Sequence, residues 1–187
     1  MIIKGGFLTM GTKRVGLARI EALMENLKRD LAMGAATFSG INANIMSVES
    51  TPVSLTAADS GKTILLNNGT TATTINLPAG STLSAGCYFQ FVPLSDNTNG
   101  YIIKRGTDDE LIKGRLIVVS TTADNTEQVS SFATNDTLTL DATNNAAKAG
   151  ARGSVVHCYW DGSAWQVWGQ LISLHASPAS VDSFSNT

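Results

Sequence analysis

Two different spacings of hydrophobic residues divide the chain. Between residues 12 and 33, apolar side chains recur at alternating intervals of three and four positions. From about residue 56 onward, apolar and polar residues alternate in short runs that are separated by turn-forming residues. The first spacing is typical of one face of an α-helix, and the second is typical of β-strands with one buried side. The sequence therefore predicts one helix followed by a β domain.

The helical segment is predicted to begin after Thr12, which suits an N-cap, and to end before Gly34, which suits the position that follows a helix. Its apolar stripe occupies heptad positions a and d and consists of Leu17, Ile20, Met24, Leu27 and Leu31. A helix this short is marginal on its own. Two interpretations stay open: the stripe packs on the chain's own β domain, or it forms an oligomer or partner interface. Two to four helices fit the pattern, and the a positions argue weakly against two.

Nine strands are predicted in the β domain, each short and bounded by residues that favour turns. They are residues 62–66, 71–77, 86–92, 101–104, 115–120, 127–133, 137–140, 154–160 and 165–172. The strongest hairpin signal joins the last two, where Asp161 and Gly162 supply the backbone conformation that a tight loop needs. Many short strands at regular spacing are typical of an antiparallel β-sandwich or barrel. We therefore expect a mainly β fold of that kind, preceded by an N-terminal arm and one α-helix.

The segments outside the helix and the strands are less regular. Residues 1–11 mix glycines with apolar residues and are predicted to form an extended arm. Small residues without a clear period make up a predicted linker over residues 35–55, with room for one strand. Residues 177–187 are mostly small and polar, which predicts a loose tail or a segment that becomes ordered on assembly. The arm and helix thus span residues 1–34, and the β domain spans residues 56–176.

Charge distinguishes the arm from the rest of the chain. The net charge of −2 gives the whole chain no nucleic-acid signature. Residues 1–34 carry six basic and three acidic side chains, whereas the rest carries seven basic and twelve acidic ones. A basic arm on an acidic body indicates a separate partner surface, although chance in a short segment gives the same count. The candidate partner-facing residues of the arm are Lys4, Phe7, Leu8, Lys13 and Arg14.

Two short motifs resemble chemical sites, a phosphate-binding loop and a pair of nucleophile and base, but neither has the pattern that such a site requires. Residues 60–63 (SGKT) resemble the end of a phosphate-binding loop, but Thr56 stands where the first glycine of that loop is required. The segment also leads into a strand, where a phosphate loop opens a helix. His157 and Cys158 are neighbours on a predicted strand and therefore point to opposite faces, so they do not form a pair of nucleophile and base.

Other candidate sites have structural interpretations. The acidic run at residues 108–110 lacks the ligand spacing of calcium loops and is predicted to be a solvated turn. Cys87 and Cys158 are predicted to be buried free thiols, with one disulfide between them left possible. No zinc-ligand spacing and no membrane-spanning apolar run is present in the sequence. We expect no enzyme, no metal or other cofactor, no nucleic-acid or membrane partner, and synthesis in the cytoplasm.

Three tryptophans gather on the predicted hairpin: Trp160, Trp165 and Trp168. Their large apolar area favours a place in the core, and an exposed contact site is the alternative. For recognition of a glycan, the pair Trp160 and Asp161 is the sequence's one candidate.

A family resemblance is carried by residues 11–23 (GTKRVGLARIEAL), 55–66 (LTAADSGKTILL), 74–78 (TINLP) and 159–169 (YWDGSAWQVWG). These segments resemble structural proteins of tailed bacteriophages, including capsid decoration, or cement, proteins. The resemblance covers about residues 12–31 and 55–172. Its motifs are more specific for a virion β module than for one part of the virion. It implies a homotrimer on the capsid surface, with the major capsid protein as partner and the host cytoplasm as the place of synthesis.

Two functions follow from this resemblance. In a decoration protein, residues 1–34 face the capsid and form the trimer, while the β domain faces outward and supplies lateral trimer contacts. In a trimeric tail or head fibre, or a receptor-binding protein, the β domain recognises the host surface. A fibre usually adds an attachment region and a long repetitive shaft, and neither is visible in the sequence. We therefore expect a structural protein that decorates and stabilises a phage capsid.

Overall fold

A computed structural model gives the fold of the chain and describes residues 44–106, 110–130 and 134–186. The predicted arm and helix, residues 1–34, lie outside this part. The described residues form twelve strands and two single-turn 3₁₀ helices, Ala57–Asp59 and Gly80–Thr82. The strands are β1 (Ile45–Val48), β2 (Val53–Ser54), β3 (Thr63–Leu66), β4 (Thr73–Asn76), β5 (Tyr88–Pro93), β6 (Tyr101–Lys104), β7 (Ile112–Ser120), β8 (Thr126–Ser130), β9 (Thr137–Leu140), β10 (Val155–Trp160), β11 (Trp165–Ser173) and β12 (Phe184–Ser185).

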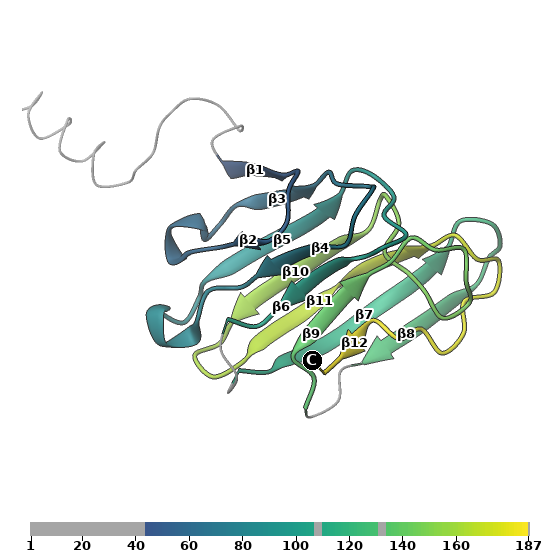
Figure 1. Ribbon diagram of the computed structural model, residues 1–187. Helices are drawn as coiled ribbons and strands as arrows, with labels where there is room; N and C mark the ends of the chain where they lie inside the picture. Colours follow the sequence, from purple (N-terminus) through teal and green to yellow (C-terminus); the bar gives the residue numbers. More distant parts are fainter. Residues whose placement is uncertain (1–43, 107–109, 131–133, 187) are drawn as a thin grey trace, which may run out of the picture. The chain divides into compact units, whose positions relative to one another are not determined.

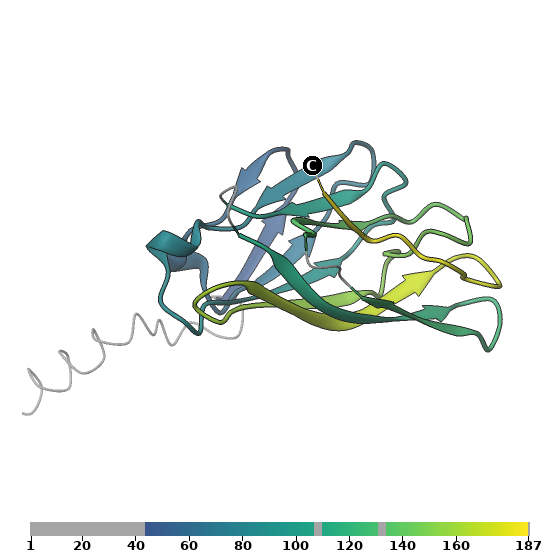
Figure 2. The ribbon, with the colours of Figure 1, turned by 90° about the horizontal axis from the view of Figure 1, so that it is seen from below.

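The strands form two sheets that pack face to face (Figure 1; Figure 2). One sheet has seven strands in the order β1-β3-β5-β10-β11-β7-β8, and the other has five in the order β12-β9-β6-β4-β2. The strand order of neither described sheet returns to its first strand, so the architecture is that of a sandwich. The predicted mainly β fold is confirmed, and of the two predicted architectures the sandwich is the one observed.

The prediction of an antiparallel fold was wrong for half of the strand pairs. Of the ten described pairs, five are parallel: β1 with β3, β3 with β5, β2 with β4, β4 with β6, and β7 with β11. From β1 to β6 the chain crosses to the other sheet after every strand. Each strand therefore returns to its own sheet after a full circuit and runs in the same direction as the neighbour it joins. The two sheets are mixed for this reason.

Strand positions agree with the sequence more closely than strand direction does. The observed β6 and β9 match their predicted bounds, and β3 to β11 each overlap a predicted strand. Three strands lie outside the nine predicted ones: β1 and β2 form within the predicted linker, where one strand was expected at most, and β12 forms within the predicted tail. The compact unit of the β domain accordingly spans Asn44–Thr187, which extends beyond residues 56–176 at both ends.

The C-terminal segment is packed rather than loose. Phe184 in β12 pairs with Leu138 in β9, and its side chain is buried. Val181 is buried as well, and its N–H donates to the carboxylate of Glu127 (3.3 Å). These two apolar side chains stabilise the tail against the five-stranded sheet, because their burial removes apolar surface from water.

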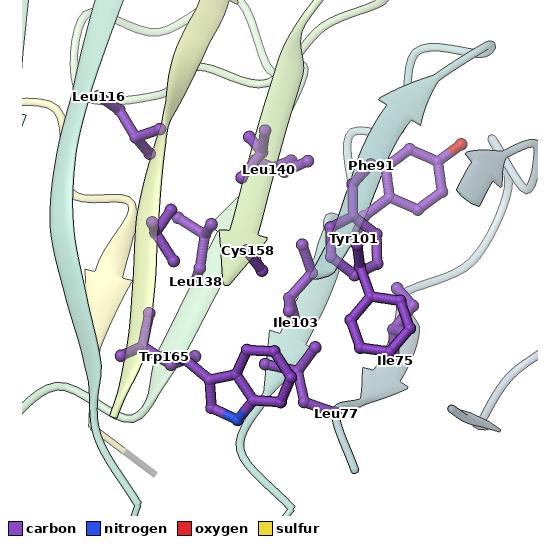
Figure 3. Close-up of a cluster of buried hydrophobic side chains, with 14 of the residues drawn as sticks. Ile75, Leu77, Phe91, Tyr101, Ile103, Leu116, Leu138, Leu140, Cys158 and Trp165 are labelled. Carbon is purple, nitrogen blue, oxygen red and sulfur yellow. The ribbon is translucent and has the colours of Figure 1, made fainter. Parts of the chain in front are cut away.

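The core fills the space between the two sheets. Alternate residues point inward, as in β5, where Phe89 and Phe91 are buried and the residues between them are partly exposed. Figure 3 shows side chains from both sheets gathered in one cluster. Each fully buried large side chain contributes about 1.5–3 kcal/mol relative to an exposed one. The described core cluster begins at Val48 and ends at Phe184, so it draws on the whole length of the sandwich.

A buried asparagine holds two turns together at one end of the sandwich. The Asn97 side chain is fully buried. Its Nδ2 donates to the backbone oxygens of Asn68 (2.7 Å) and Thr71 (2.8 Å), and its Oδ1 accepts from the N–H of Asn99 (2.8 Å). The turn that follows β3 is therefore fixed to the turn that follows β5, which supports the parallel neighbours β4 and β6.

Candidate functional site

The interface residues predicted from the sequence lie outside the described part of the chain. This holds for the heptad stripe Leu17, Ile20, Met24, Leu27 and Leu31, and for the arm residues Lys4, Phe7, Leu8, Lys13 and Arg14. The candidate site that the structure describes is instead on the seven-stranded sheet. Its side that points away from the five-stranded sheet is called the outer face below.

The hairpin of β10 and β11 separates the three tryptophans. Trp160 and Trp165 are a cross-strand pair and are both buried, with ring centroids 5.5 Å apart. Trp168 is three positions after Trp165 on the same strand, so it points to the outer face, where it is 46% exposed. Both interpretations of the tryptophans thus apply, the core to two of them and the exposed contact site to the third.

Trp168 is held in place by a stack of rings on the outer face. The imidazole of His157 lies opposite it on β10, with ring centroids 5.4 Å apart and planes inclined by 16°. The Tyr88 ring of β5 contacts both of the other rings: its centroid lies 5.8 Å from that of His157, with planes inclined by 22°, and 6.3 Å from that of Trp168, with planes inclined by 35°. The Tyr88 hydroxyl also shares a hydrogen bond with Nδ1 of His157. These contacts restrict the rotamers of all three side chains.

Burial keeps this stack neutral. It lowers the pKa of the His157 imidazole below its ordinary value of 6.5, and it raises the pKa of the Tyr88 hydroxyl above its ordinary value of 10.0. At neutral pH both groups are therefore uncharged. The stack presents an aromatic surface without a charge of its own.

A shallow cleft lies beside Trp168 and is called the Trp168 cleft below. It has a volume of about 530 Å³. Its lining residues come from three neighbouring strands of the seven-stranded sheet, β10, β11 and β7, whose order can be followed in Figure 1. Its lining consists of Arg115 and Ile117 from β7, Val155 and His157 from β10, and Trp168, Gly169 and Gln170 from β11. In the strand register, Gly169 lies at the centre of the other six residues.

Besides the neutral ring stack, the polar side chains of the outer face include amides and cations. The four central strands β5, β10, β11 and β7 contain no Asp or Glu, but β7 contributes Lys113 and Arg115. The chain has four glutamines, and all of them lie on this sheet at positions whose strand neighbours are more buried: Gln90, Gln128, Gln166 and Gln170. Arg115 forms no ion pair with a described residue. The outer face is therefore suited to bind polar or anionic groups.

The two rejected motifs have structural roles. The Lys62 ammonium pairs with the Asp59 carboxylate at 2.6 Å, next to a 3₁₀ turn that leads into β3. Cys158 is buried while His157 is on the outer face, so the predicted separation of these neighbours is confirmed. Cys87 and Cys158 are both buried and free, as predicted. Burial raises the pKa of both thiols, which keeps them protonated.

The solvated turn predicted at residues 108–110 was wrong at Glu110, which is buried. Its carboxylate accepts hydrogen bonds from the N–H groups of Gly80 and Gly106. Next to it, the Arg105 guanidinium pairs with the buried Asp136 carboxylate at 3.0 Å. A buried carboxylate requires such donors. Glu110 therefore anchors the loop before β7 to the turn at Gly80, and Asp108 and Asp109 lie outside the described residues.

Asp161 makes the turn between β10 and β11 sensitive to acid. Its Oδ1 accepts from the N–H groups of Ala164 (2.8 Å) and Ser163 (2.7 Å), and these bonds hold its pKa at about 2, below the ordinary 3.8. Because the folded pKa is below the unfolded one, Asp161 stabilises the fold above pH 4 and loses this contribution as the pH falls towards 2.

We expect the stability difference between the wild type and Asp161→Asn to shrink as the pH falls from 4 to 2, because the asparagine keeps an acceptor but does not titrate. Urea unfolding at a series of pH values measures it. Asp124→Asn, in the exposed turn between β7 and β8, controls for the loss of one carboxylate. If the difference in the free energy of unfolding between the wild type and Asp161→Asn stays constant down to pH 2, the role assigned to Asp161 is contradicted.

No group of three or more His, Cys, Asp or Glu side chains in the described part of the chain is placed to hold a metal ion. Within the same residues, no helix is long and apolar enough to cross a membrane. Comparison of the chain with family models, with curated proteins and with solved structures gave no match.

Proposed function

We propose that this chain is a virion structural protein that decorates and stabilises the capsid of a tailed bacteriophage as a surface-bound homotrimer. Its partners are the major capsid protein and two further copies of itself. In this proposal, residues 1–34 bind the capsid and join the protomers, and the sandwich faces outward with lateral contacts between copies. The role is mechanical and not enzymatic. Many weak contacts, multiplied by the number of copies, hold the shell together.

The observation that carries the proposal is that the sandwich fills its own core. The described core cluster begins at Val48 and ends at Phe184, and the inward faces of the two sheets cover each other. A two-layer domain of this kind buries its apolar faces without a third layer. Because the sandwich does not need the heptad stripe of residues 17–31 to complete its core, we assign the stripe to a partner interface in this proposal. The four resembling segments point to the same kind of protein.

The heptad stripe is the part of the proposal that a substitution tests most directly. Ile20→Asp combined with Leu27→Asp places two charges at d positions, which is expected to convert a trimer of three times 19.6 kDa into monomers. Occupancy on expanded capsids at equal protein concentration is expected to fall by at least about tenfold, because the avidity of the trimer is lost. Light scattering and co-sedimentation with capsids measure the two effects.

The matched control changes the net charge equally at polar positions of the same segment. Asn26→Asp combined with Arg29→Gln is expected to leave the mass and the capsid binding unchanged. A double d-position variant that stays trimeric and still binds capsids would refute the proposed role of the stripe. A trimer that survives deletion of residues 1–34 would instead place the oligomer contacts in the sandwich.

The exposed Trp168 cleft favours a second candidate, a trimeric tail or head fibre or receptor-binding protein. A fixed aromatic side chain beside an arginine and amides is suited to contact a host surface. Immunogold labelling of intact virions distinguishes the two candidates. Label distributed over the capsid supports decoration, whereas label confined to the tail or to single head sites supports a fibre.

A further inference from the structure

From the geometry of the outer face we infer that the Trp168 cleft binds an acidic saccharide, a pyranose unit that bears a carboxylate or a sulfate. The inference concerns the sandwich alone, so it holds for a protein on the capsid and for one on a fibre. It rests on three features of the cleft: an exposed ring held in place, a local charge that attracts anions, and a size that fits sugar rings.

The first feature is the exposed ring of Trp168. Its indole is 46% exposed, although the other two tryptophans of the chain are buried. His157 on β10 stacks against it, whereas Arg115 is its neighbour on the opposite side, on β7. The ring is thus held by its neighbours and borders the cleft, which His157 and Arg115 also line. Aromatic faces stack on the C–H face of a pyranose, and a fixed ring binds with a smaller loss of rotamer entropy.

The second feature is charge. No carboxylate occurs on the four central strands, and Arg115 lines the cleft without an ion-pair partner among the described residues. Lys113 lies two residues before it on the same side of β7. The guanidinium matches a carboxylate or a sulfate with two parallel N–H donors. Because the chain as a whole is acidic, this local excess of cations marks the cleft as a place for an anion.

The third feature is the size and lining of the cleft. A volume of about 530 Å³ falls in the range of small-molecule sites and corresponds to roughly one or two sugar rings. The Gln170 amide and the exposed Ile117 complete the rim. An amide donates to and accepts from hydroxyl groups, which a saccharide carries all around its ring. Apolar, amide and cationic groups are thus placed around one aromatic ring.

A nucleic acid fits the outer face less well. Single-stranded nucleic acid needs a charged groove along its backbone and several aromatic platforms. The outer face offers two cations near the cleft and one largely exposed aromatic side chain. A contact between the outer faces of two copies fits poorly as well, because the four central strands carry no carboxylate that could neutralise Arg115 and Lys113 of the other copy.

The experiment uses the full-length protein and isothermal titration calorimetry with two matched pairs of probes. Lactose 3′-sulfate is compared with lactose, and digalacturonate with its methyl ester, so that each pair differs by the charge. We expect saturable binding of at least one acidic probe, at least about tenfold tighter than its uncharged counterpart. The two pairs show whether the carboxylate or the sulfate is preferred.

Variants assign the binding to the cleft. Arg115→Gln is expected to remove the preference for the charged probe, and Trp168→Ala to weaken both members of a pair by about tenfold or more. Trp168→Tyr keeps a stacking ring and is expected to retain part of the binding. Arg152→Gln and Leu94→Ala change an exposed arginine and an exposed apolar residue outside the cleft, and they are expected to bind as the wild type does.

Several results would overturn the inference. The first is that neither acidic probe shows saturable binding. The second is that Arg115→Gln and Trp168→Ala bind the acidic probe as tightly as the wild type does. The third is that an oligothymidylate competes with the acidic probe and binds more tightly. A mass that falls on Trp168→Ala would show that a second copy covers the cleft and would overturn it as well. Because the titrations use the free protein, a negative titration does not contradict the proposed binding to the capsid. In the same way, failure to bind capsids does not contradict saccharide binding in the titrations.

Discussion

Replacing Gly114 with alanine is expected to lower the free energy of unfolding by about 4 kcal/mol. Gly114 lies in β7 opposite Val167 of β11, with a φ of +158°. A Cβ at this position would lie 1.8 Å from the backbone oxygen of Val167 and 2.6 Å from its carbonyl carbon. Both atoms belong to the backbone of a central strand, so the collision is relieved only by separating β7 from β11. Guanidinium unfolding followed by tryptophan fluorescence measures the loss.

Gly61→Ala is the control for this experiment. Gly61 also has a positive φ, +85°, but nothing lies within 4 Å of the Cβ position. Its substitution is expected to cost about 1–2 kcal/mol, which is the cost of the backbone conformation without a collision. Equal losses for Gly61→Ala and Gly114→Ala would show that the close approach of β7 and β11 does not set the cost.

Gly114 also explains why the sequence placed the start of β7 too late. The predicted strand began at Arg115, whereas the observed β7 begins at Ile112. A glycine inside a strand pattern marks a bulge or a close approach of two backbones, and at Gly114 it is a close approach. Which strand approaches is a matter of sheet order, and periodicity carries no information about sheet order. The local signal was therefore visible in the sequence, but its cause was not.

The same limit explains the error in strand direction. A period of two specifies which side chains point inward, and it does so equally for parallel and antiparallel neighbours. The hairpin at Asp161 and Gly162 was predicted correctly because its turn chemistry is local. The parallel pairs, such as β1 with β3, depend on circuits through the opposite sheet, which no short segment encodes.

For the candidate site, the sequence indicated one part and missed the rest. Trp165 and Trp168 are three positions apart on one strand, so they had to face opposite sides. This spacing is sufficient to predict that one of the two tryptophans lies on the exposed face of the sheet. The neighbours of Trp168, His157 on β10 and Arg115 on β7, are defined only by how the strands pair in the fold. The burial of Glu110 was missed for the same reason, because one of its donors, the N–H of Gly80, comes from a turn 30 residues earlier in the chain.

Replacing Trp165 with alanine is expected to lower the free energy of unfolding by about 4 kcal/mol. The side chain is fully buried, and its ring packs against Phe89 (centroids 5.8 Å apart) and Trp160 (5.5 Å). Its removal from β11 leaves a cavity beside the rigid rings of Phe89 on β5 and Trp160 on β10. Such a site collapses poorly, which places the cost at the upper end of the usual range. Chemical unfolding of the variant measures the loss.

Two further variants separate the contributions to this cost. The Trp165 Nε1–H is buried and has no acceptor among the described residues, so Trp165→Phe removes an unsatisfied donor together with part of the ring. It is expected to cost about 1–2 kcal/mol, well below alanine.

Trp168→Ala, on the outer face, is expected to cost less than about 1 kcal/mol, because nearly half of that side chain is already in water. If phenylalanine at position 165 costs as much as alanine, the indole N–H has a partner that stabilises it, and its burial is not a penalty. If Trp168→Ala costs as much as Trp165→Ala, the stack with His157 belongs to the structural core, and a role of the Trp168 cleft in binding would then have to be established with Arg115 alone.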